Sequence, residues 1–416
     1  MNRADQKATK PNIVDWLGYL SIVSMPVVAL ANLVSVFHIG SLSIRATDIL
    51  FLLSSALCGA KLILEARSES SLRTYIQRIL GLVTLSVLGI LLLHNSVDWP
   101  KYLRFVQTML WGALSLAFMK EEKHFKKLTD SVVFVGVFMS STALYLHFRD
   151  PDLQRIAGYM SFAGGEGLEG QASFNDWGAF YVLVLTILLW RSYQGVRSVS
   201  HVMALGVVSC GLLLVQSRSA LVALSVVVLF LAVLWIRKLL RERARKLLWA
   251  HLLLPIFLLA FMVIASDSLA LNRFSETFVT GSSADLSVTI RFLLWQRSAE
   301  LWTADILRFL LGYGSAAFTN LIDSPTADNF YLDHGVSEGF LGLILILRIL
   351  VTPVLKLRRN GLLNNHMILA TLVVAVALIV SVTGNVLVDP TYGGVTFILL
   401  YGIVSIHSRE CLPRSR

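Results

Sequence analysis

The chain has 416 residues, of which 56% are hydrophobic and 15% are charged, with a mean hydropathy of +0.70 and a formal net charge of +10. Such a composition excludes an ordinary water-soluble domain and predicts a protein that lies mostly in lipid. The three cysteines show no spacing typical of zinc ligation or of a disulfide framework, so we expect no metal and no cofactor.

The apolar runs predict about twelve membrane-spanning helices, because a bilayer core about 30 Å thick needs roughly 20 apolar residues per helix. Continuous rather than alternating runs exclude a β-barrel. We therefore predict an all-α, polytopic integral membrane protein in which residues 1–416 form a single transmembrane domain. The predicted spans are 14–37, 46–65, 76–94, 102–119, 129–147, 176–192, 200–216, 219–236, 249–267, 336–355, 367–387 and 392–408.

The basic residues predict the orientation, because Lys and Arg concentrate in cytoplasmic loops. With both termini in the cytoplasm, 25 of the 36 Lys and Arg residues fall on the inner side, 10 on the outer side, and Arg348 lies within a span. This placement explains the net charge as basic loops facing anionic lipid, rather than as a nucleic-acid-binding surface. Of the ten outer cations, Lys101 is the single lysine, and arginine is better suited than lysine to bidentate phosphate contacts.

Two predicted outer segments are longer than tight turns. The smaller, 148–175, is rich in glycine and contains Arg155 in RIAGY and Asn175 in FNDWGAF. The larger, 266–335, is polar and contains several arginines and aspartates between apolar runs. A chain that exposes one large charged loop and places the remainder in lipid favours an anionic ligand at that loop.

The segment QSRSA at 216–220 joins two apolar runs with almost no loop, which places Arg218 near the outer boundary of the membrane. One interpretation is an arginine that reaches the lipid headgroups. The other is a functional residue, because an arginine at this depth is costly and usually faces a polar cavity or a partner.

The large loop contains a predicted helix, DLSVTIRFLLWQRSAELW, with Asp285 as its N-cap. Arg291 and Trp295 are four residues apart and share a face of this helix. We expect the helix to lie along the membrane surface, and the LGYG that follows at 311–314 to form a tight turn. The side chains expected to face apolar surroundings are Ile290, Leu293, Leu294 and Leu301.

The segment DSPTADNFYLDHGVSEGFLG at 323–342 gathers polar residues where the next span begins. Either these are solvated residues at the rim of a helix, or a carboxylate accepts a proton from a sugar hydroxyl. Asp328 is the candidate base, His334 is the rival, and Asp328 capping the helix is the simpler alternative. The residues concerned are Asp328, Asn329, Asp333, His334 and Glu338.

In their order, these motifs resemble the O-antigen polymerase and O-antigen ligase superfamily of bacterial inner membranes. The resemblance rests on SRSA at a helix junction, R-x-x-x-W in the large loop, LGYG, and DNFYL followed by EGFLG. RIAGY and FNDWGAF resemble the other outer loop of the family, so the similarity covers about residues 150–345.

The resemblance implies a periplasm-facing glycosyltransferase that uses an undecaprenyl-diphosphate-linked saccharide as donor. It implies that Arg218 and Arg291 contact the lipid diphosphate and that Arg155 holds the acceptor or growing chain. O-antigen ligases usually have histidine where this chain has Asp328, which favours a polymerase. The predicted catalytic residues are Asp328, Arg218 and Arg291, and the predicted substrate-binding residues are Arg155, Asn175, Trp295, Asn329 and His334.

The sequence thus predicts an inner-membrane enzyme that polymerises lipid-linked oligosaccharide repeats into O-antigen or exopolysaccharide. The expected partners are the lipid-linked saccharide, membrane lipid, a chain-length regulator and a flippase, and not nucleic acid. The alternatives are an O-antigen ligase that transfers polysaccharide to lipid A core, or a saccharide transporter. A transporter is disfavoured because Asp and Glu are nearly absent from mid-span positions.

Overall fold

The structure, a computed structural model, describes most of the chain. The described residues are 13–30, 37–39, 42–44, 46–64, 70–150, 156–157, 160–161, 174–196, 198–242, 286–322, 324, 326–359, 365–388 and 390–410.

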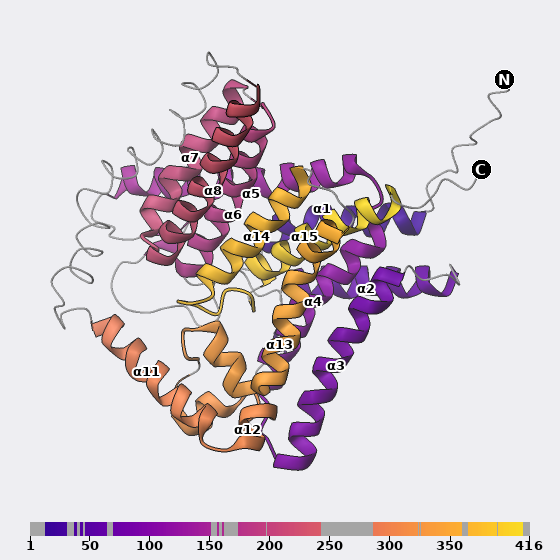
Figure 1. Ribbon diagram of the computed structural model, residues 1–416, viewed down its shortest axis with the longest axis vertical. Coiled ribbons are helices and arrows are strands. Elements are labelled where there is room, and N and C mark those ends of the chain that lie inside the picture. Colours follow the sequence, from indigo (N-terminus) through magenta and orange to yellow (C-terminus); the bar gives the residue numbers. More distant parts are fainter. Residues whose placement is uncertain are drawn as a thin grey trace.

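The described residues are mainly helical, with two short antiparallel hairpins (Figure 1). The helices before the large loop are α1 (Ile13–Leu30), α2 (Ala46–Leu64), α3 (Ser70–Leu93), α4 (Trp99–Phe118), α5 (Glu122–Arg149), α6 (Phe174–Tyr193), α7 (Val199–Val215) and α8 (Arg218–Glu242). Those that follow are α11 (Leu286–Thr303), α12 (Ile306–Leu311), the π-helix η3 (Phe318–Ile322), α13 (Phe330–Arg359), α14 (Asn365–Val380), the π-helix η4 (Pro390–Gly394) and α15 (Val395–Glu410). The hairpins pair β1 (Phe37–Ile39) with β2 (Leu42–Ile44), and β3 (Ile156–Ala157) with β4 (Met160–Ser161).

Eleven of the predicted spans coincide with helices, and 249–267 lies outside the described residues. Within the part that is described, four helices are long and apolar enough to cross a membrane: Ser71–Leu93, Glu122–Arg149, Arg218–Lys238 and Phe330–Arg358. Shorter apolar helices accompany them, so the chain is a helical membrane protein. The count of about twelve spans stays a prediction.

The centre of the bundle is α6, which is buried on all sides. Its residues from Trp177 to Trp190 are almost completely inaccessible, and it packs against α5, α7, α8 and α14. A helix that is apolar around its whole circumference is expected to be enclosed by other helices. By contrast, α8 exposes Val222, Val226, Leu229 and Val233 along one face, as expected for a helix in contact with lipid.

Helix α13 is broken at Gly339, and the LGYG turn fills the break. Gly339 has φ of 70°, which interrupts the helical hydrogen bonds. The N–H groups of Tyr313 and Gly314 donate to the carbonyls of Val336 and Ser337, at 2.7 and 2.9 Å. A Cβ at Gly312 would lie 2.3 Å from the Ser337 carbonyl oxygen, so the two backbones touch and only glycine fits. The tight turn predicted for 311–314 is confirmed.

Several predicted span edges differ from the helices: α3 and α5 begin at Ser70 and Glu122, before the predicted 76 and 129, and two further edges show the cause. The apolar run 336–355 begins near the break, but the helix starts earlier, at Phe330, where Asn329 caps it. The run 367–387 is helical only to Val380, and residues 381–388 then form a turn segment. In both places hydropathy misjudged the edge, because capping and turn hydrogen bonds decide where a helix begins and ends.

Candidate functional site

The candidate site begins with the turn that precedes α13. Asn329 caps the helix, since its Oδ1 accepts the N–H groups of Tyr331 and Leu332 at 3.0 and 3.2 Å. Asp328 has φ of 53°, an uncommon conformation for a residue other than glycine, and its N–H donates to Thr326 Oγ1 at 2.9 Å. The turn therefore holds Asp328 in a strained conformation, and such strain is typical of functional sites.

Helix α11 packs the face that carries Arg291 and Trp295 against this turn. Arg291 Nε donates to Asp328 Oδ2 at 3.3 Å, and Trp295 Nε1 donates to the carbonyl oxygen of Ala327 at 3.0 Å. The expectation that Arg291 and Trp295 share a face is confirmed. Asp285, the predicted N-cap of α11, lies outside the described residues.

The four apolar side chains of α11 expected to face apolar surroundings divide into two pairs. Leu294 and Leu301 pack against a small core that includes Phe318 and Val336, as expected. Ile290 and Leu293 are exposed on the surface of the protein, so apolar surroundings for them stay a prediction. The reason is the period of the helix: the face that carries Arg291, Trp295 and the buried Ser298 points to the protein, and Ile290 and Leu293 then point away.

The second part of the site is the junction between α7 and α8. Gln216 adopts a left-handed conformation (φ 53°), and α8 starts at Arg218, so the two helices are joined almost without a loop, as predicted. The Ser217 hydroxyl donates to Asn175 Oδ1, in the first turn of α6, at 3.3 Å. Gly178 permits this approach, because a Cβ there would lie 2.5 Å from Ser217 Cβ.

The turn segment 381–388 connects the two parts. Asn175 Nδ2 donates to the Thr383 carbonyl oxygen at 3.3 Å. On the other side, the N–H of Phe330 donates to the Ser381 carbonyl oxygen at 2.9 Å. The N-termini of α6, α8 and α13 therefore meet around this segment, and helix N-termini favour negatively charged groups.

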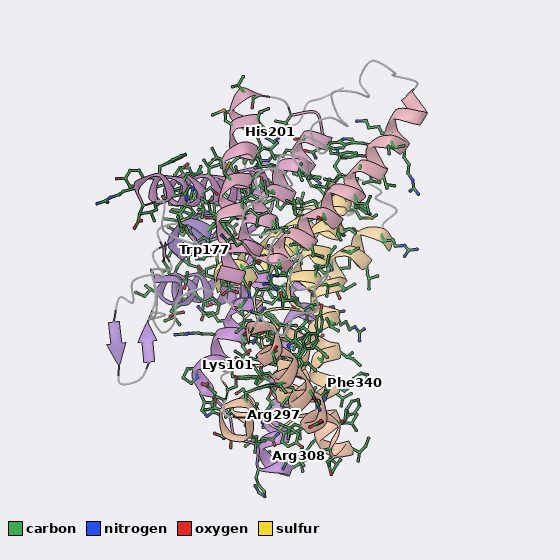
Figure 2. The ribbon with its side chains drawn as sticks, turned by 90° about the vertical axis from the view of Figure 1, so that its left-hand side faces the viewer. Lys101, Trp177, His201, Arg297, Arg308 and Phe340 are labelled. Atoms are coloured by element: carbon green, nitrogen blue, oxygen red, sulfur yellow. The ribbon has the colours of Figure 1, made fainter. Side chains whose placement is uncertain are left out.

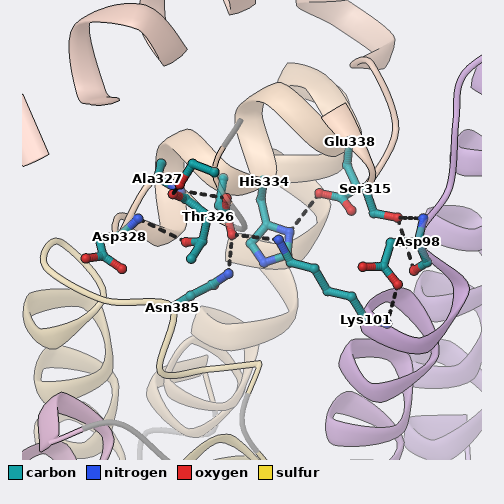
Figure 3. Close-up of polar contacts among 11 residues, drawn as sticks. Asp98, Lys101, Ser315, Thr326, Ala327, Asp328, His334, Glu338 and Asn385 are labelled. Atoms are coloured by element: carbon teal, nitrogen blue, oxygen red, sulfur yellow. Dashed lines mark hydrogen bonds and ion pairs between the residues drawn. The ribbon is translucent and has the colours of Figure 1, made fainter. Parts of the chain in front are cut away.

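A buried carboxylate, Asp333, stands at the centre of the network, and its partners Ala327, Lys101 and Asn385 are labelled in Figure 3. Its Oδ1 accepts the N–H of Ala327 at 3.1 Å, and its Oδ2 accepts Lys101 Nζ from α4 at 3.3 Å. Asn385 Nδ2 also donates to Oδ2. The turn before α13, helix α4 and segment 381–388 thus all hydrogen-bond to one side chain, and that residue is 1% exposed.

His334 is buried one turn deeper in α13. Its Nδ1 forms a 2.7 Å bond with Glu338 Oε2, and its ring lies against Phe105 and Phe330 with centroid distances of 4.3 Å. Nε2 has no hydrogen-bond partner among the described residues. The surroundings fix this ring, and they do not present it beside Asp328 at the surface.

In the turn before α13 and its contact with α11, the accessible charges are Asp328 and Arg291. Their side chains are 45% and 30% exposed, whereas those of Asp333, His334 and Glu338 are almost completely buried. An accessible carboxylate can accept a proton from a substrate hydroxyl, and an adjacent guanidinium can bind an anionic group. Among the described carboxyl groups of this segment, Asp328 is therefore the one that is open to proton transfer.

The structure places Arg291, Trp295, Asp328 and Asn329 in one contact group, and Asn175 beside the Arg218 junction in another. Arg155 lies outside the described residues. The roles predicted for all eight residues stay predictions.

The sequence predicted no contact among Asp333, Lys101 and Asn385, although the structure places all three at the centre of the network. Two of them gave a signal: Asp333 lies in the polar segment 323–342, and Lys101 is the single lysine among the predicted outer cations. Asn385 gave none, because it lies within an apolar run.

Lys101, Arg297 and Arg308 lie toward the end of the molecule that holds α11 and α12, Trp177 of α6 lies nearer the middle, and His201 lies at the other end (Figure 2). The loop between α3 and α4 contacts α12 and the LGYG turn at this end: Asn95 Nδ2 donates to the Gly312 carbonyl oxygen, and Arg308 of α12 donates to Asn95 Oδ1. The LGYG turn is thereby held from two sides.

Comparison with known families gives a match for residues 201–347, to the family described as O-antigen ligase. This segment contains Arg218, Arg291, Trp295 and the whole turn with Asp328 and Asn329, so the resemblance expected from the sequence is confirmed there. Lys101, Asn175 and Asn385 lie outside the matched segment. No curated protein matches the chain in sequence.

Proposed function

We propose that this helical membrane protein, whose residues 201–347 carry the O-antigen ligase family segment, polymerises undecaprenyl-diphosphate-linked oligosaccharide repeats into O-antigen or exopolysaccharide. The observation that carries the proposal is the contact of Arg291 with Asp328 in a strained turn at the start of α13. A group that binds an anion and a group that accepts a proton are thereby adjacent.

Breaking the bond between a sugar and a diphosphate leaves negative charge on the phosphate oxygen. Arg291 and Arg218 are suited to bind that charge, because fixed guanidiniums stabilise it most where water is partly excluded. The N-termini of α6, α8 and α13 add favourable dipoles around segment 381–388. We assign the donor diphosphate to this region.

Asp328 is assigned as the base. The acceptor hydroxyl oxygen attacks the anomeric carbon, the bond from that carbon to the phosphate oxygen breaks, and its electron pair leaves with the diphosphate. The hydroxyl proton passes to Asp328, and a direct displacement inverts the anomeric centre.

The membrane orientation belongs to the same proposal. The excess of basic residues on one side supports cytoplasmic termini in the bacterial inner membrane, with the site at the periplasmic face. Arg155 is assigned to the acceptor chain, and a flippase and a chain-length regulator are the proposed protein partners. Cysteine labelling checks the orientation: residues near 160 and 300 should react from outside, and those near 242 and 358 from inside.

The test uses purified protein in nanodiscs with a lipid-diphosphate-linked repeat. Arg218→Ala and Arg291→Ala should each lower transfer at least 100-fold, and lysine substitutions should rescue poorly because they lose the bidentate geometry. Arg73→Ala is the control, an arginine of α3 that the site does not use. Full activity of Arg218→Ala or Arg291→Ala would refute the proposed donor site.

The description of the matched family favours a second candidate, an O-antigen ligase. The two activities differ in the acceptor and not in the donor. Supplying the donor with either a second lipid-linked repeat or a lipid A core therefore distinguishes them. A polymerase forms a ladder of products with the first acceptor, whereas a ligase forms product with the second.

A further inference from the structure

We propose that Asp333, Lys101 and Asn385 are positioning residues that set the separation and orientation of the two arginine-bearing parts of the site. The inference rests on the proposed function, in which Arg218 and Arg291 bind one diphosphate. Lys101 and Asn385 lie outside the matched segment 201–347, so the family segment alone is incomplete as a site.

Hydrogen bonds connect Asp333 to the turn that carries Asp328 and to the helix that carries Arg291. Asp333 Oδ1 accepts the N–H of Ala327, and the carbonyl of the same residue accepts the indole N–H of Trp295. The backbone directly before Asp328 is thus held on both its N–H and its C=O. Because Trp295 lies one turn after Arg291, the same contacts fix α11 against the turn.

Asp333 is also connected to the α7–α8 junction that carries Arg218. Asn385 donates to Asp333, and its segment offers the Thr383 carbonyl to Asn175, which in turn accepts the Ser217 hydroxyl. Hydrogen bonds, connected through the backbone of Ala327 and of residues 383–385, therefore run from Trp295, through Asp333, to the residue before Arg218. The two arginines lie on elements joined by these contacts.

Lys101 neutralises the charge of Asp333. Asp333 is 1% exposed, and a buried carboxylate needs a compensating charge. Lys101 supplies it from the N-terminal end of α4, where its own backbone N–H is bound by Asp98 at 3.2 Å (Figure 3). Lysine suits this task because a single point charge is required, and not the bidentate geometry that the arginines provide.

The experiment measures geometry and kinetics in the same proteins. Spin labels at Ala299→Cys on α11 and Val222→Cys on α8, in a background without Cys58, Cys210 and Cys411, report the distance between the two parts. The variant is Asp333→Asn. The matched control is Asp15→Asn, which removes the charge of an aspartate bound by two lysines, Lys61 and Lys120, at the other end of α4.

We expect Asp333→Asn to broaden the distance distribution, to lower kcat about 10- to 100-fold and to raise the KM for the donor, while Asp15→Asn changes neither the distances nor the kinetics. The exchange Asp333→Asn with Asn385→Asp keeps one carboxylate and one amide in contact, and it should recover at least tenfold in kcat. Rescue of this kind separates a positioning role from simple loss of folded protein.

An unchanged distance distribution, or kinetics equal to those of Asp15→Asn, would overturn the inference even if the arginine variants are inactive. The opposite result, a broadened distribution together with fully active Arg218→Ala and Arg291→Ala, would leave the linkage intact and refute the proposed function. Where Asp333→Asn yields too little protein, Asn385→Ala gives the same measurement, because it removes one donor and leaves the Lys101 pair in place.

Discussion

Each end of α4 holds an aspartate paired with lysine, but the two clusters do different things. At one end, Asp15 binds Lys61 and Lys120, and Lys61 also donates to the Ala117 carbonyl oxygen, so the cluster joins α1, α2 and α4. At the other end, Asp333 binds Lys101 and also the backbone N–H of Ala327, directly before Asp328. The same ion-pair chemistry fixes helices in one place and the turn that carries the proposed base in the other.

The difference lies in what the second carboxylate oxygen contacts. At the Asp15 end both oxygens contact lysines, and the result is helix packing. At the Asp333 end one oxygen contacts a backbone amide that belongs to a strained, non-helical turn. We therefore expect substitutions near Asp333 to change the transfer reaction, and equivalent substitutions near Asp15 to change only stability.

The largest effect should come from Asp328→Asn, which keeps the shape of the side chain and removes the charge that accepts the proton. We expect a loss of kcat of roughly 100-fold or more with donor binding retained, and a milder effect from His334→Ala. Transfer rates and donor affinity of the purified proteins provide the measurement. If Asp328→Asn polymerises at the normal rate, then His334 or catalysis by the arginines alone replaces the assigned base.

A smaller but clear effect is expected from Gly312→Ala. Its Cβ would lie 2.3 Å from the Ser337 carbonyl oxygen at φ of 79°, so the LGYG turn must move away from the break in α13. We expect a destabilisation of about 2–3 kcal/mol, and lower transfer because α11 and α12 rest on this contact. Gly206→Ala in α7 is the control, since nothing lies within 4 Å of its Cβ and it should be neutral or slightly stabilising. Similar unfolding temperatures for both variants would contradict this account.

Trp295→Phe should have a moderate effect. It keeps the aromatic ring and removes the indole N–H that donates to the Ala327 carbonyl oxygen. The lost hydrogen bond contributes about 1 kcal/mol to stability. Transfer should fall a few-fold, mainly in kcat. Trp16→Phe, at the Asp15 end of the molecule and half exposed, should leave the kinetics unchanged. Equal kinetics for the two tryptophan variants would show that the Ala327 contact has no role in the reaction.

The smallest effect is expected from Lys120→Ala. Asp15 retains Lys61 as a partner at 2.8 Å, and both Lys120 and Asp15 are partly accessible to solvent. We expect a loss of no more than about 1 kcal/mol in stability and no change in transfer. A change in kcat would show that the Asp15 end is coupled to the site, and the contrast between the two ends would then be lost.

Much of the fold was predictable because helix formation in lipid depends on local hydrophobicity. The α7–α8 junction at residues 216–217 followed directly from two adjacent apolar runs interrupted by QSRSA. The contact of α11 with the turn was predictable only in part. The spacing of Arg291 and Trp295 gave the shared face, but it did not give Asp328 and Ala327 as the partners of that face.

The sequence by itself determined the helical membrane class, the family segment and the charged residues that are candidates for contacting a substrate. Each of these depends on residue types within a few turns of one another, and the hydrophobic free energy of a run is a sum over those residues. Only the tertiary structure decided that Lys101 and Asn385 meet Asp333, across separations of 232 and 52 residues. Such hydrogen bonds depend on which helix ends come together in space, and neither hydropathy nor spacing along the chain encodes that.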